Sequence, residues 1–552
     1  MPTLEWIGKD KVINHHQEVP YRILDKKYTY NAESSENMII HGDNLLALKS
    51  LLPQYEGKVD CIYIDPPYNT GNEKWVYNDN VNDPKIKKWL GEVVGQEGED
   101  LSRHDKWLCM MYPRLKLLQR LLASEGVAFI SIGEDEVANL KIICDEIFGY
   151  SNRCGIISRV MKSGGNKGNF FSPNIDYILV YAKNISLLSN FKTKLDEKLV
   201  KKLYTQIQNT GDRKGERYRP FGLYQSSLDS RPNQRYYIVC PDGTYAIPPG
   251  KAMPSRIADG EQVLPQKGDG CWRWSAERYL LEKEKNNLVF KKSKGVLVQP
   301  DGSPSKWNVY TKIWLADRKE EGQTPTNFIT EFENRHSAKE LTSYGVEFDF
   351  SKPSKLIMYL IELALDKKEA IILDSFAGSG TTAHAVLDLN KQDGGNRKFI
   401  LVEMMDYADT ITAERVKRVI DGYGEGGKAV EGLGGDFSYY EIGAPLFNED
   451  KNLNEEVGED EIRKYVYYME TKLPLEVVAD DNRYYMGKAN DTAYYFYYEK
   501  DEPTTLNRDF LATVKTKASG YLIYADVCAL PKETLDKNGI VFKKIPRDIK
   551  KL

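Results

Sequence analysis

The stretch CIYIDPPYNTGNEKW, Cys61 to Trp75, decides the fold. An apolar run from Val59 to Ile64 leads directly into Asp65, two prolines and Tyr68. Two consecutive prolines cannot continue a central strand, because proline lacks a backbone N–H and fixes its own φ. The sequence therefore predicts a buried strand whose carboxyl end presents a carboxylate, carbonyl oxygens and an aromatic ring.

Alternating strands and helices surround this motif and return near the end of the chain. Apolar runs of strand length are followed by segments with helical apolar spacing. This rhythm predicts an α/β fold with a doubly wound, mostly parallel sheet, and it allows an antiparallel edge. Expected strands are residues 38–43, 59–64, 126–132, 154–160, 175–182, 370–373 and 399–402, and expected helices are residues 44–52, 108–123, 135–148, 354–365 and 379–389.

The middle of the chain has a different composition. From residue 187 to 345 helical rhythm is brief, turn signals are frequent, and arginines interleave with aromatics, as in Arg217-Tyr218-Arg219. Residues 186–345 carry 27 Lys and Arg against 19 Asp and Glu, whereas the whole chain has a formal net charge of −4. A basic segment of this kind indicates contact with a polyanion, although chance asymmetry of a solvated surface explains it equally well.

These shifts in pattern divide the chain into four segments. We expect residues 1–185 and residues 345–430 to form the two parts of one α/β domain. Residues 186–344 are expected to form a domain inserted between them. Residues 431–552 are tyrosine-rich and acidic, and we expect a small α+β domain there. Its residues indicate no chemistry, so contact with a second copy or a partner is its candidate role.

The cysteines and the first residues of the chain indicate the cellular compartment. The seven cysteines are scattered without a CxxC pair, and no zinc spacing is present. The first residues, MPTLEWIGKDK, lack the basic-then-apolar pattern of a secretion signal, and no apolar run reaches 18 residues. We therefore expect free thiols in a reducing cytoplasm, without a metal site or a membrane span.

A second motif, LDSFAGSGTT at residues 373–382, follows an expected strand and opens an expected helix. Gly378 and Gly380 allow a ligand close approach to the backbone, but the lysine of a phosphate-binding P-loop is missing. A dinucleotide fingerprint fits nominally, with Ala383 in its third place, and a simple tight turn remains an alternative. Glu403 ends the apolar run that follows, and an acid there can bind ribose hydroxyls. The sequence thus predicts a cofactor that contains a nucleoside.

The groups of the first motif suit an exocyclic amine on a nucleobase. A carboxylate and a carbonyl can accept its two hydrogens, and the Tyr68 ring can stack on the base. Such hydrogen bonds also stabilise the positive charge that grows on nitrogen during attack. Chemistry on a base of a duplex requires that the base be flipped out into a pocket. The alternative is a polar turn with a buried tyrosine.

The two motifs together resemble those of the amino-methyltransferases that act on DNA with S-adenosylmethionine. The catalytic motif precedes the cofactor loop and a basic region lies between, which is the order of the β class of N6-adenine methyltransferases. The stretches DPPYNTGN, MMYPRLKLLQRLL and GVAFISIGEDEVANLKIICDEIFG are similar to the modification (Mod) subunits of type III restriction–modification systems. The resemblance covers residues 36–184 and 345–420.

The resemblance implies roles for individual residues. In the motif Asp65-Pro66-Pro67-Tyr68, Asp65 and the Pro66 carbonyl would accept hydrogen bonds from the adenine amine, and Tyr68 would stack on the flipped base. The implied cofactor site consists of Asp43, Lys352, Asp374, Phe376, Gly378, Gly380, Thr381 and Glu403. Lys352 belongs to a lysine–proline element that covers the methionine part of the cofactor. Phe170 and Phe171 would form a second wall of the base pocket.

The implied function is a site-specific, adenine-specific DNA methyltransferase that transfers a methyl group to N6 by direct displacement, without a metal. Cytosine-N4 methylation remains an alternative, although Ser in place of Asp65 would favour it. A catalytically degenerate nucleic-acid-binding module is a further alternative, against which both intact motifs argue. The resemblance also implies double-stranded DNA as substrate, target recognition by residues 186–344, a homodimer, and a separate helicase–nuclease restriction subunit as candidate partner.

Overall fold

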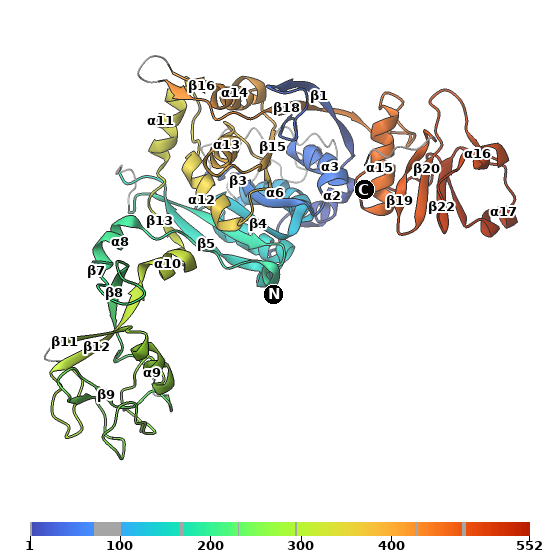
Figure 1. Ribbon diagram of the computed structural model, residues 1–552. Coiled ribbons are helices and arrows are strands. Elements are labelled where there is room, and N and C mark those ends of the chain that lie inside the picture. Colours follow the sequence, from blue (N-terminus) through green and yellow to red (C-terminus); the bar gives the residue numbers. More distant parts are fainter. Residues whose placement is uncertain are drawn as a thin grey trace. The chain divides into compact units, whose positions relative to one another are not determined.

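The chain forms two compact units, residues 1–189 with 326–552 and residues 190–325. The computed structural model describes residues 3–70, 101–164, 170–229, 231–292, 295–424, 429–476 and 482–551 (Figure 1). None of the helices in these ranges is long and apolar enough to span a membrane.

The first unit is built on a ten-stranded sheet in the order β1-β18-β2-β15-β14-β3-β4-β6-β5-β13. Its strands are β1 (Arg22–Tyr30), β18 (Phe437–Pro445), β2 (Met38–His41), β15 (Lys398–Glu403), β14 (Ile371–Asp374), β3 (Val59–Ile64), β4 (Leu122–Ile132), β6 (Ile175–Ala182), β5 (Arg153–Val160) and β13 (Phe328–Ile329). The six strands from β18 to β4 run parallel, whereas β1 and β6 are antiparallel to their neighbours. The expected mostly parallel α/β sheet is therefore present.

Helices cover both faces of this sheet (Figure 1). On one face α3 (Asn44–Tyr55), α6 (Leu101–Leu121) and α7 (Val137–Cys144) share a core with the alternate strand residues Ile62 and Ile64. On the other face α12 (Ser354–Ala364) packs against α13 (Thr381–Asp393) and lies over β3 and β4. Because successive side chains of a strand point to opposite faces, a single apolar run such as 59–64 serves both cores.

The second unit has a small antiparallel sheet in the order β11-β12-β8-β7. Its elements are α8 (Glu197–Leu203), β7 (Gln206–Ile207), β8 (Arg217–Gly222), β9 (Ile238–Val239), β10 (Tyr245–Ala246), α9 (Ala276–Glu284), β11 (Leu288–Lys292), β12 (Trp307–Trp314) and α10 (Leu315–Glu321). Trp272, Tyr236 and Tyr279 are fully buried in its core. This part of the chain is a folded body with its own apolar interior.

The unit is shorter than the expected insertion of residues 186–344. β13 and α11 (Asn334–Tyr344) belong to the first unit. β13 pairs in parallel with β5, and the buried Arg159 of β5 donates hydrogen bonds to the Phe332 carbonyl and to the Asn334 side chain. Pairing at the sheet edge therefore returns the chain to the first unit before residue 345.

The expected boundary at residue 431 also falls at a different place. β18 follows that boundary, yet it lies between β1 and β2 in the main sheet, and Phe437 and Tyr439 are buried there. A smaller sheet, in the order β19-β20-β22-β24, comes later in the chain. Its elements are α15 (Glu459–Thr471), β19 (Tyr485–Ala489), β20 (Thr492–Phe496), α16 (Arg508–Thr513), β22 (Gly520–Ala525), α17 (Lys532–Lys537) and β24 (Ile540–Lys544).

Removing β18 should damage the main sheet. A protein that ends at residue 430 leaves β1 without its strand partner and β2 with an open edge, so we expect aggregation or a melting temperature several degrees below that of a protein ending at residue 445. Both proteins lack everything after residue 445, so their difference isolates β18. Thermal unfolding followed by circular dichroism, with size-exclusion chromatography, measures the effect. Equal melting temperatures would show that β18 is dispensable.

Candidate active site

Four carboxylates lie at the carboxyl ends of four neighbouring parallel strands. Asp43 follows β2, Glu403 ends β15, Asp374 ends β14 and Asp65 follows β3. In open α/β sheets, ligands bind in the crevice outside the carboxyl ends of the strands. The strand order thus brings residues from both ends of the sequence to one edge.

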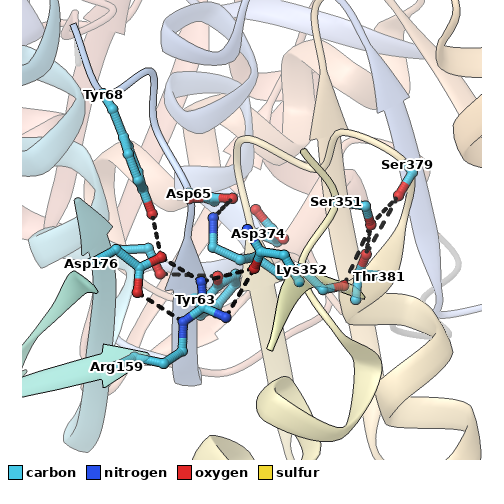
Figure 2. A network of polar contacts seen from close by, with 12 residues as sticks. Tyr63, Asp65, Tyr68, Arg159, Asp176, Ser351, Lys352, Asp374, Ser379 and Thr381 are labelled. Atoms are coloured by element: carbon cyan, nitrogen blue, oxygen red, sulfur yellow. Dashed lines mark hydrogen bonds and ion pairs between the residues drawn. The ribbon is translucent and has the colours of Figure 1, made fainter. Parts of the chain in front are cut away.

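Asp65 is paired with a lysine from a distant part of the chain. Lys352 Nζ lies 2.5 Å from Asp65 Oδ2 and 4.9 Å from the centroid of the Tyr68 ring (Figure 2). The Lys352 side chain is 8% exposed and that of Asp65 is 22% exposed. The second oxygen, Asp65 Oδ1, is buried and has no hydrogen-bond partner among the described residues. One carboxylate oxygen is therefore available to a donor that enters the site.

The Tyr68 ring is held from two sides. Its hydroxyl donates to Asp176 Oδ2 at 3.3 Å, and Asp176 accepts from Arg159 Nε at 2.8 Å (Figure 2). A Cβ added at Gly133, in the turn after β4, would lie 2.9 Å from the ring, so glycine there lets the ring approach the backbone. Burial, followed by the nearby Asp65 carboxylate, raises the pKa of Tyr68 well above its ordinary value, so the hydroxyl stays a donor.

The rest of the motif is fixed by hydrogen bonds to α6 and to the turn before α7. Trp107 Nε1 donates to the Pro67 carbonyl at 2.8 Å. Pro66, the residue between Asp65 and Pro67, is buried. Asn69 is fully buried with a φ of 59°, and its amide donates to the buried Glu136 carboxylate. Gly71 and Asn72, which complete the quoted motif, lie outside the described residues.

The loop after β14 is organised by Asp374. Its Oδ1 accepts from the backbone N–H of Phe376 at 3.0 Å, and its Oδ2 accepts from Thr382 Oγ1 at 2.6 Å. Gly378 and Gly380 have φ values of 52° and 81°, a conformation that side chains disfavour. Burial raises the pKa of Asp374 to about 7. The loop is therefore a rigid turn at the N-terminus of α13.

A buried cluster of polar side chains is hydrogen-bonded to this loop. The guanidinium of the fully buried Arg415 donates to Ser379 Oγ at 2.7 Å and to Thr381 Oγ1 at 2.8 Å. Ser351 Oγ lies 3.0 Å from Ser379 Oγ and 3.1 Å from Thr381 Oγ1 (Figure 2). The Thr381 hydroxyl, an expected cofactor contact, is thus engaged within the protein, and Ser351 joins the loop to the neighbouring Lys352.

Glu403 and Asp43 complete the crevice. Glu403 Oε2 accepts from the Gly378 N–H at 2.8 Å, Oε1 accepts from the Met405 N–H at 3.0 Å, and burial raises the pKa of Glu403 to about 7. Asp43 Oδ1 caps α3 by accepting from the Leu45 N–H at 2.8 Å, and its Oδ2 lies 3.3 Å from Arg114 Nη2. Each of the two acids is therefore fixed in place by the main chain.

Phe170 and Phe171 are not brought to the site. The two residues are 93% and 91% exposed. They follow residues 165–169, which lie outside the described ranges, and no apolar surface on the described elements covers them. The expected second wall of the base pocket is therefore not formed by these rings in this structure.

Comparison with known proteins identifies the family of this chain. Residues 59–414 match the N6/N4 methyltransferase family described as DNA methylase. The chain is 32% identical over 442 residues to the type III restriction-modification enzyme EcoPI Mod subunit of Escherichia phage P1, which corresponds to 73% of this chain and 63% of that protein. It is 31% identical over 450 residues to the StyLTI Mod subunit of Salmonella typhimurium, or 75% and 62% of the two chains.

A third relative is matched over more of its own length. The type II methyltransferase M.KpnI of Klebsiella pneumoniae is 32% identical over 384 residues, 67% of this chain and 81% of that protein. The chain spans less than two thirds of the two Mod subunits. The family match begins at β3, passes through the loop after β14 and ends at Glu414, so it includes both motifs. The protein therefore belongs to the N6/N4 DNA methylase family.

Proposed function

We propose that the protein transfers a methyl group from S-adenosylmethionine to N6 of an adenine flipped out of double-stranded DNA. The observation that carries this proposal is the arrangement after β3. The Asp65 carboxylate has a buried oxygen without a hydrogen-bond partner among the described residues, the Pro66 carbonyl follows it in the chain, and the Tyr68 ring lies nearby. Two acceptors and one flat ring are what an exocyclic amine on a base requires.

The residues of the site would act by hydrogen bonding and orientation. Bound S-adenosylmethionine supplies the electrophilic methyl group. Asp65 and the Pro66 carbonyl would accept the two amine hydrogens and turn the nitrogen lone pair away from the ring. As the new N–C bond forms and the methyl–sulfur bond breaks, positive charge would grow on the amine, where the Asp65 carboxylate would stabilise it until one amine proton is lost to solvent. Tyr68 would stack on the base, with its ring held by Asp176.

The cofactor site fits a nucleoside with vicinal hydroxyls. Glu403 is a buried acid whose oxygens are aligned by the Gly378 and Met405 N–H groups, and a carboxylate in this place can accept hydrogen bonds from ribose hydroxyls. Ser375 Oγ, in the same loop, is buried without a hydrogen-bond partner among the described residues. Gly378 has a φ of 52°, a backbone conformation that side chains rarely adopt, and it lets the chain turn here. These groups support the assignment of the cofactor to this loop.

The second unit is proposed to recognise the DNA sequence. Two lysines lie over tyrosines on one face of its sheet, with Lys291 Nζ 5.2 Å from the Tyr310 ring and Lys312 Nζ 5.2 Å from the Tyr218 ring. Cations and aromatic rings together suit phosphates and base edges or faces.

By analogy with the Mod subunits, we further propose a cytoplasmic homodimer that works with a separate restriction subunit. Contact between subunits is the proposed role of residues 446–552.

Asp65→Ala should abolish methyl transfer while leaving cofactor binding intact. Losing a partner that acts mainly on the transition state costs about 100- to 1000-fold in rate. Transfer of tritiated methyl groups to mixed-sequence DNA measures the rate, and calorimetry with S-adenosylmethionine measures binding. Asp366→Ala, at an exposed acid of the loop before β14, is the matched control and should keep full activity. A folded Asp65→Ala protein with wild-type activity would exclude the proposed role.

Cofactor affinity should rise with pH through the Glu403 carboxylate. Burial raises the pKa of this group to about 7, and the ionised form is the better acceptor for ribose hydroxyls. Because only the ionised fraction binds well, we expect affinity to increase by up to about tenfold from pH 6 to pH 8. Asp374 titrates in the same range, so the effect is read as the difference between wild type and Glu403→Gln.

Calorimetric titration with S-adenosylmethionine at several pH values provides this comparison. Glu403→Gln should bind more weakly at pH 8 and show a flatter pH profile than the wild type, since the amide does not ionise. Parallel profiles for the two proteins would contradict the assignment of the ribose to Glu403.

A further inference from the structure

The Lys352 ammonium lies beside both groups that the proposed function gives to the target base. It donates to Asp65 Oδ2 at 2.5 Å and lies 4.9 Å from the Tyr68 ring centroid, so it touches both groups that are to receive the base (Figure 2). Its side chain is 8% exposed, which places the charge inside the protein. The ammonium and a nucleobase amine both donate N–H groups and cannot occupy one space.

The main chain holds this lysine at the pocket. Ser351 is hydrogen-bonded to Ser379 and Thr381 of the cofactor loop, and Pro353 is the N-cap residue of α12. The backbone on both sides of Lys352 is thus anchored, while its long side chain has several rotatable bonds. The ammonium can therefore leave Asp65 by rotamer changes without movement of α12 or of the loop.

Charge explains why the lysine points inward. A largely buried carboxylate is costly without a cation or donors, and in the described part of the chain Lys352 donates to the Asp65 side chain. The pairing keeps the Asp65 side chain oriented in the absence of DNA. A base that stacks on Tyr68 has to displace the ammonium from that ring, and its amine hydrogens can then replace the hydrogen bond that Asp65 Oδ2 loses.

We propose that Lys352 is an internal competitor of the target base, which holds Asp65 until a base with a suitably placed exocyclic amine displaces it. This inference rests on the proposed function. This role of Lys352 differs from covering the methionine part of the cofactor, because here Lys352 competes with the target base for Asp65. It also implies selectivity: a base that lacks an amine at the position facing Asp65 cannot replace the lost hydrogen bond, so the lysine should exclude it.

The test uses 2-aminopurine in place of the target adenine, in a duplex carrying the sequence that the wild-type enzyme methylates. This fluorescent base has no 6-amino group and brightens when it leaves the stack. With enzyme in excess and no cofactor, Lys352→Met should raise the fluorescence at least about twofold over wild type. Lys355→Met is the matched control, an exposed lysine three residues on, and should behave as wild type. Anisotropy of a labelled duplex confirms equal DNA binding.

A double-variant comparison separates competition from a structural effect. In an Asp65→Asn background the ion pair is already broken, so adding Lys352→Met should give no further increase in fluorescence. If Lys352→Met does not fold, Lys352→Gln, which also lacks the charge, takes its place.

The outcomes separate the inference from the proposed function. If the wild type methylates DNA and the folded, DNA-binding Lys352→Met and Lys352→Gln proteins are no brighter than wild type, the competitor role of Lys352 is wrong. An equal gain from Lys352→Met in the Asp65→Asn background would also overturn it. A wild-type protein that methylates no DNA would instead remove the proposed function.

Discussion

The ion pair between Asp65 and Lys352 joins the two parts of the sheet that lie on either side of the second unit in sequence. Asp65 follows β3, and Lys352 directly precedes Pro353 at the start of α12. The neighbouring Ser351 is bound to Ser379 and Thr381, so one short segment contacts both the catalytic motif and the cofactor loop. Correct placement of either motif therefore depends on the whole first unit being folded.

Four acidic side chains line the crevice, and each has different hydrogen-bond or ion-pair partners. Asp43 is paired with Arg114 and the N-terminus of α3, and Asp65 is paired with Lys352. Asp374 and Glu403 have donors that are neutral, and burial raises the pKa of each to about 7. A cationic ligand would favour the ionised forms of these two acids, which agrees with a proposed cofactor that carries a sulfonium charge.

Local patterns predicted the elements of the sheet well. β3 occupies the expected residues 59–64, β15 extends the expected run 399–402 by one residue at each end, and the acids at the strand ends lie side by side. Helix α6 continues through Pro113, because its buried apolar residues on both sides outweigh one lost hydrogen bond. Periodicity reports local conformation and burial, and these parts of the prediction needed nothing else.

Long-range partners were not predictable in the same way. No local signal shows that β18 inserts between β1 and β2, because strand order depends on which edges meet in space. The same holds for Arg159 and Asp176 behind Tyr68 and for Lys352 against Asp65, since each pairs residues from different strands or segments. The predicted contact of Phe170 and Phe171 with the base stays a prediction, because both residues are almost fully exposed in this structure and the base is absent from it.

The most direct test of the central claim, that the pocket at Asp65 and Tyr68 acts on an adenine amine, is the identity and position of the base that the protein modifies in a cell. Genomic DNA from a host with and without the gene can be sequenced by a method that distinguishes N6-methyladenine from N4-methylcytosine. We expect N6-methyladenine at one defined sequence, present with the wild-type gene and absent with Asp65→Ala. N4-methylcytosine at that sequence, or no modified base with a well-expressed, folded protein, would contradict the claim.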